Sequence, residues 1–71
     1  MNQAAAVRDR LAAEDPAFQR LVRKHKELDE RLQELQTLKF LTEDEKLEIV
    51  NLKKRKLALK DQMEEIVRQA S

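Results

Sequence analysis

The sequence predicts an all-α fold, an antiparallel two-helix coiled-coil hairpin, on three observations. The 71 residues include no Gly and one Pro, and 41% of them are charged, a composition typical of long helices and coiled coils. Apolar residues recur with helical periodicity on both sides of residue 42. Between the two stretches, Thr42 followed by Glu45 is a capping box, which marks a helix start. The chain must therefore reverse direction at this point.

The segment 1–14 is rich in alanine and is predicted to be either a short helix or a frayed arm, because isolated helices of this length are marginal in water. Asp15-Pro16 marks its end, since Pro disfavours helical geometry in the preceding residue and suits the first position of a new helix. Asp15 is also a good N-cap. We expect the hairpin over 15–71, with a helix over about 16–40, a turn at about 40–42 and a helix over about 43–69.

Each predicted helix has one apolar seam, and the two seams match when the helices run antiparallel. The seam of the first helix is Phe18, Leu21, His25, Leu28, Leu32 and Leu35. The seam of the second helix is Ile49, Leu52, Lys56, Leu59, Met63 and Ile66. In this register Leu32 meets Leu52, and Lys56 can reach Asp29 at the seam's edge. Such an ion pair would select the register more than add stability, because desolvation offsets much of the attraction.

Two expectations concern the exposed side and the end of the first helix. Glu27 and Arg31 stand four residues apart on its charged face and are predicted to pair. Lys39 is expected to complement the dipole at the C-terminal end of this helix. Phe40 is expected to be committed to the turn.

The second helix carries more apolar residues than one seam needs. Leu47, Val50 and Leu57 form an additional strip, which would stay exposed in a monomer. Contiguous apolar strips usually mark an interface. We therefore predict a homodimer that forms a four-helix bundle, or docking onto the helices of a partner protein.

Three blocks of the sequence resemble the YdcH-type small bacterial proteins. They are Glu14-Asp15-Pro16-Ala17-Phe18, Lys24-His25-Lys26-Glu27-Leu28-Asp29 and Leu52-Lys53-Lys54-Arg55-Lys56-Leu57-Ala58-Leu59-Lys60-Asp61. The resemblance covers about residues 11–67, spacing between the blocks included. It implies a short cytoplasmic helical hairpin from a family of unknown function. It also implies that the family's pattern includes His25, Asp29, Lys53, Lys54, Lys56, Lys60 and Asp61.

A basic block on the second helix suggests an alternative function. Residues 52–60 hold five basic side chains and no acidic one, among them Lys53, Lys54, Arg55 and Lys60. Such a block can attract phosphates, as in an accessory RNA- or ribosome-associated protein. Consecutive residues on a helix point in all directions, however, and the chain has no Tyr or Trp to stack on bases. Nucleic acid is therefore the second choice of partner.

No residue pattern supports a catalytic, cofactor or metal site. The chain has no Cys and a single His, too few ligands for a zinc site. His25 lies four residues before Asp29, but acid–base catalysis also needs a substrate pocket, so we interpret His25 as a structural residue of the seam. No apolar run approaches the ~20 residues that span a bilayer, and no secretory signal is evident. We expect a non-catalytic cytoplasmic interaction module without a membrane or small-molecule partner.

Overall fold

The computed structural model describes residues 3–70, and over that range it contains three α-helices and no strand. The helices are α1 (Gln3–Glu14), α2 (Pro16–Gln36) and α3 (Glu43–Ala70). The all-α prediction is therefore confirmed for these residues. Met1, Asn2 and Ser71, which the predicted segments 1–14 and 15–71 include, lie outside the described residues.

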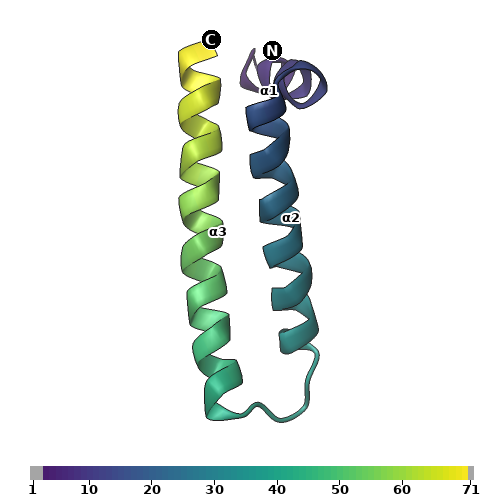
Figure 1. Cartoon of the computed structure of the whole chain (residues 1–71), viewed down its shortest axis with the longest axis vertical. Coiled ribbons are helices and arrows are strands. Elements are labelled where there is room, and N and C mark those ends of the chain that lie inside the picture. The colour runs from purple at the N-terminus through teal and green to yellow at the C-terminus, as the bar shows by residue number, and fades with distance from the viewer. Residues whose placement is uncertain (1–2, 71) are drawn as a thin grey trace.

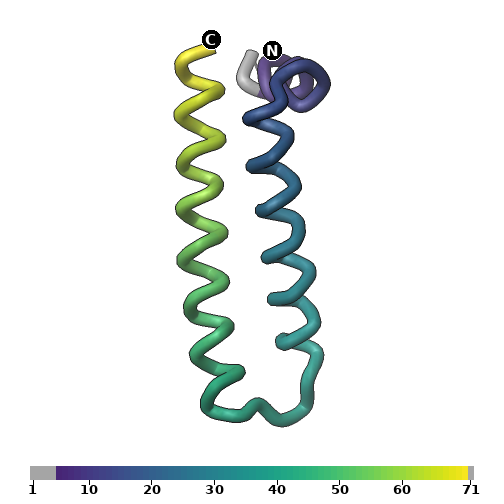
Figure 2. The backbone as a smooth tube through the Cα atoms, viewed as in Figure 1, coloured from purple at the N-terminus to yellow at the C-terminus, as the bar shows by residue number. Residues whose placement is uncertain are grey.

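The two long helices lie side by side and run in opposite directions, joined at one end by residues 37–42 (Figure 1). α1 lies across the other end of the pair, beside the C-terminal end of α3 (Figure 2). It packs against both long helices. The molecule is elongated, with principal extents of 43 × 24 × 16 Å. One end of the molecule thus has three helices in contact, whereas the other has two helices and their connection.

Both long helices begin at side chains that the sequence identifies as caps. The Asp15 Oδ1 accepts hydrogen bonds from the backbone N–H groups of Ala17 (2.9 Å) and Phe18 (3.0 Å), and Pro16 follows at the first helical position. At the start of α3, the Thr42 N–H donates to Glu45 Oε1 (2.8 Å), and the Glu45 N–H donates to Thr42 Oγ1 (3.1 Å). This is the predicted capping box, which satisfies two backbone donors that the helix leaves free.

α2 ends at Gln36, before the predicted limit of about 40. The Thr37 hydroxyl donates to the Glu34 carbonyl (2.7 Å), and the Leu38 N–H donates to the Leu35 carbonyl (3.2 Å) in a tighter, 3₁₀-type bond that closes the helix. A left-handed glycine cap is not available, since the sequence has no Gly, and no described residue has a positive φ. The chain therefore reverses over residues 37–42 rather than within about 40–42.

The early end of α2 moves Lys39 and Phe40 out of the helix. Phe40 is 84% exposed, and the Lys39 Nζ lies 5.8 Å from the centre of its ring, within the range of a cation–π contact. The prediction for Lys39 is therefore wrong, because Lys39 lies beyond the end of α2 instead of supporting its last turn. Phe40 lies in the connection, as expected, with its ring exposed.

Buried apolar side chains form two clusters, one towards each end of the helix pair. Near the connection, the buried residues are Leu32, Leu35 and Leu52, with Leu28 and Ile49 packed against them. At the end with three helices, the buried residues are Leu11, Phe18 and Val67, with Val7, Met63 and Ile66 packed against them. α1 thus contributes Leu11 to the second cluster, and the segment predicted as a helix or a frayed arm is a packed helix over its described residues.

Candidate interaction surface

All the predicted seam residues are buried or half-buried in the structure. Phe18, Leu32, Leu35 and Leu52 are buried. The half-buried residues are Leu21, His25, Leu28, Ile49, Lys56, Leu59, Met63 and Ile66. Leu32 and Leu52, which the predicted register pairs, belong to the same cluster. The seam therefore holds α2 and α3 together and leaves other surfaces for a partner.

The predicted ion pair between Asp29 and Lys56 is present and joins α2 to α3. The Lys56 Nζ donates a hydrogen bond to Asp29 Oδ1, and the Gln33 Nε2 donates to Asp29 Oδ2 (2.9 Å). The hydrogen bond from Lys56 holds the pKa of Asp29 below its ordinary value, and the positive charge of Lys56 and proximity to His25 add to this effect. Lys56 is thus used within the monomer, while its neighbours in the basic block remain available.

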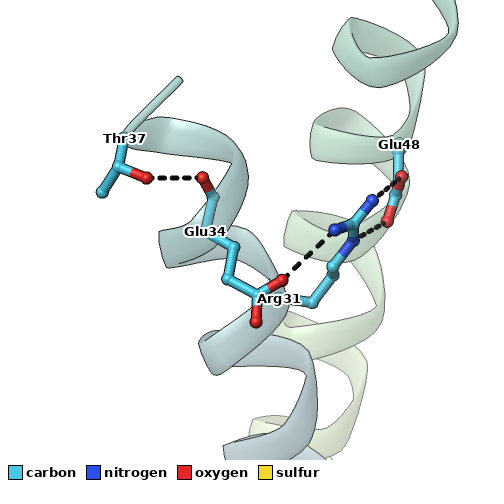
Figure 3. A network of polar contacts seen from close by, with 4 residues as sticks. All are labelled: Arg31, Glu34, Thr37 and Glu48. Atoms are coloured by element: carbon cyan, nitrogen blue, oxygen red, sulfur yellow. Dashed lines mark hydrogen bonds and ion pairs between the residues drawn. The ribbon is translucent and has the colours of Figure 1, made fainter.

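A second ion pair between the long helices involves Arg31. Its Nε and Nη2 donate to the two carboxylate oxygens of Glu48 (2.7 and 3.1 Å), and its Nη1 donates to Glu34 Oε2 (3.2 Å) (Figure 3). The hydrogen bonds that Glu48 accepts from Arg31 lower the pKa of Glu48. Glu27, the predicted partner of Arg31, is not in this network. Glu48 comes directly before the seam residue Ile49, and this position beside the seam of the antiparallel helix is the feature of the sequence that could identify it as the partner of Arg31.

The two ion pairs predict an acid-sensitive stability. A carboxyl group whose pKa is lower in the folded chain contributes stability above its ordinary pKa of about 4, and this contribution is lost as the pH falls through the folded value. We expect the free energy of unfolding to fall between neutral pH and about pH 3. In urea denaturation, the Asp29→Asn, Glu48→Gln double variant should lose less over this range. Asp61→Asn, which changes an exposed carboxylate that makes no ion pair among residues 3–70, should behave like the wild type. Equal acid sensitivity of all three proteins would refute the assignment.

The predicted apolar strip lies open on α3. Leu47 is 59% exposed, Val50 48% and Leu57 60%. At ~100° per residue, these positions lie on the side of α3 opposite the residues that face α2. α1 packs at the other end of the pair, around Phe18 and Val67, and so leaves the strip open. Within α2, Val22 is the only large apolar side chain of the described residues in the exposed class. The apolar surface that remains for a partner is therefore concentrated on α3.

The four predicted nucleic-acid contacts are exposed, but the structure does not gather them in one patch. Lys53, Lys54, Arg55 and Lys60 have no acidic partner among the described residues. Arg55 and Lys24 line a shallow groove between α2 and α3. Lys60 lines a different hollow, beside Arg8 where the three helices meet. The free cations thus point to more than one side of the molecule.

Residues 3–70 contain neither a cluster of metal ligands nor a membrane-spanning helix. His, Asp and Glu side chains in that range do not form groups of three or more with the spacing of metal ligands. None of the helices described there has the length and apolar character needed to cross a membrane.

The comparisons with known proteins give one match. A family model described as "Protein of unknown function (DUF465)" matches residues 18–67. The chain belongs to this family. The DUF465 match includes nearly all of α2 and most of α3, and with them the seam, the apolar strip and the basic block. It does not include α1. The curated proteins and the solved structures gave no match to this DUF465 chain.

Proposed function

We propose that the chain is a non-catalytic cytoplasmic interaction module of the YdcH type, a name with which the DUF465 match is compatible. In this proposal α2 and α3 form a coiled-coil hairpin. The strip of Leu47, Val50 and Leu57 packs against a second copy, which joins two hairpins through their α3 helices into a four-helix assembly, or against helices of another protein. The module needs no cofactor, metal ion or small-molecule substrate.

The observation that carries the proposal is the exposure of three large apolar side chains on one side of one helix. The strip spans eleven residues of α3, and its ends are about 15 Å apart along the helix. Scattered apolar side chains are normal on a protein surface, whereas a contiguous row is typical of an interface. A second helix laid along this row would remove it from water, as α2 does for the opposite side of α3.

Light scattering with refractive-index detection tests the self-association, since the chain has no Trp or Tyr for absorbance. We expect the mass to rise with concentration from 8.4 kDa towards twice that value. The Leu47→Ser, Leu57→Ser double variant should stay at 8.4 kDa over the same concentrations, because both substitutions remove apolar surface from the strip. A wild type that remains monomeric throughout would overturn the self-association.

The matched control leaves the strip intact and changes the basic block. The Lys53→Gln, Arg55→Gln, Lys60→Gln triple variant should still self-associate, since none of the three lies within the row. Circular dichroism of the double variant and of the triple variant checks that both remain helical. A change in mass then reports association and not unfolding.

The alternative function, an accessory RNA- or ribosome-associated protein, is favoured by one observation. Lys53, Lys54, Arg55 and Lys60 are exposed and make no ion pair with an acidic residue in the part of the chain that the structure describes. Binding through them would weaken steeply as salt is added. The same triple variant discriminates the two functions. If the chain binds RNA, this variant loses retention on a labelled RNA together with its salt dependence, whereas the Leu47→Ser, Leu57→Ser variant keeps both.

A further inference from the structure

We infer that the apolar strip binds the same strip of a second copy antiparallel, with Leu47 packed on Val50 of the second copy and Lys54 beside its Glu43. The inference rests on the proposed self-association and adds its orientation and register. It is carried by the exposure and spacing of the residues on the outer side of α3 and by the charges among them.

The outer side of α3 has a heptad pattern of its own. Leu47, Val50, Lys54 and Leu57 follow one another at alternating steps of three and four, the spacing of a coiled-coil seam. Glu43, the first residue of α3, continues the same spacing. Phe40, which is 84% exposed, lies in the connection just before this point. The surface available to a second copy is therefore longer than the three predicted strip residues.

Charge decides the orientation. Lys54 stands within the row and has no acidic partner among the described residues. In a parallel dimer, Lys54 of one copy would face Lys54 of the other, which places two like charges together at the interface. In an antiparallel dimer around a two-fold axis, Lys54 faces a different residue, and each contact occurs twice.

Charge and apolar matching then decide between antiparallel registers one heptad apart. With Leu47 on Val50, Lys54 meets Glu43, and Leu57 lies level with the second copy's connection, which carries the exposed Phe40. With Leu47 on Leu57 instead, Lys54 meets Val50, and Asp61 faces Glu43. The first register pairs opposite charges, whereas the second opposes a cation to an apolar side chain and two acids to each other.

Glu43 is available for this contact. Its side chain is 90% exposed, and its only ion pair among residues 3–70 is with Lys46 (3.1 Å) on the same turn of the helix. An exposed pair of this kind contributes little to stability, so exchanging Lys46 for Lys54 of the second copy costs little. The two α3 helices then lie in the centre of the four-helix assembly, and each α2 lies outside.

Disulfide cross-linking reads the register directly, because the natural chain has no Cys. Equimolar Leu47→Cys and Val50→Cys variants of the full chain, one carrying a mass tag, are mixed and mildly oxidised. We expect a cross-linked heterodimer from this mixture and from Glu43→Cys with Lys54→Cys. Leu47→Cys with Leu57→Cys should give several-fold less. In the inferred register these positions are offset by one heptad, about 10 Å along the helix, which exceeds the ~7 Å between Cα atoms that a disulfide can bridge.

A charge exchange provides a second reading without cysteines. Lys54→Glu and Glu43→Lys should each weaken the dimer several-fold in light scattering, and the double variant should recover wild-type association. Dimers that cross-link mainly through Leu47→Cys with Leu57→Cys, or a double variant that stays weak, would overturn the register while leaving self-association intact. A monomer with no cross-link in any mixture would overturn both.

Discussion

Replacement of Phe18 by alanine is expected to destabilise the chain by about 3–5 kcal/mol, the usual cost of removing a buried aromatic side chain. Phe18 is 4% exposed and lies between Leu11 of α1 and Val67 of α3. A chain of 71 residues has a total stability of roughly 4–11 kcal/mol, so this one substitution removes a large part of it. Urea denaturation followed by circular dichroism measures the loss.

The other phenylalanine of the chain provides a matched control. Phe40 is 84% exposed, and Phe40→Ala should change the free energy of unfolding by no more than about 0.5 kcal/mol. Hydrogen exchange adds a local test, because loss of Phe18 removes the residue against which Leu11 packs. The amides of α1 should then exchange faster than those of α2 near Leu32. Equal losses from Phe18→Ala and Phe40→Ala would contradict the two clusters.

The helix starts and the seam of this fold are predictable because their causes are local or periodic. Asp15 and Thr42 cap the helices that follow them with their own side chains, so a few residues suffice to locate each start. The seam follows from heptad spacing, which depends only on how residues repeat around a helix. The contact of Lys56 with Asp29 follows in turn from the antiparallel register.

The features that the sequence did not indicate depend on competition between weak local terms or on contacts between distant segments. α2 ends at Gln36 because the Thr37 hydroxyl bonds to the Glu34 carbonyl, while the heptad pattern continues through the end of the helix. Leu11 is buried because α1 folds back onto the helix pair, a tertiary contact that the propensity of a short alanine-rich segment does not reveal. Arg31 pairs with Glu48 across the helices instead of with Glu27 on its own.

For the candidate surface, periodicity locates the apolar strip but does not identify what covers it. Leu47, Val50 and Leu57 are exposed where a second heptad pattern places them on α3. The basic block is a run in the sequence, whereas in the structure Arg55 and Lys60 line separate hollows. A run of basic residues in the sequence does not show which side of the molecule each side chain reaches, because this direction depends on the turn of the helix and on the neighbouring helix.

Replacement of Leu35 by alanine tests the cluster near the connection. Leu35 is fully buried and packs with Leu32 and Leu52. We expect a loss of about 2–5 kcal/mol, which combines the lost burial and the cavity left behind. Alanine favours the helix slightly more than leucine does, so the loss reports packing and not helix propensity. Urea denaturation at a low protein concentration, where the chain is monomeric, provides the measurement.

Leu57→Ala is the control that separates packing within the chain from packing between copies. Leu57 is 60% exposed, so its truncation should change the stability of the monomer by no more than about 0.5 kcal/mol. If the chain associates as proposed, the wild type should gain stability at high concentration and Leu57→Ala should gain less, because binding of a second copy stabilises the folded chain by mass action. Leu35→Ala should show its loss at both concentrations. If Leu57→Ala costs as much as Leu35→Ala in the dilute monomer, the outer side of α3 is covered within one chain and is not an interface.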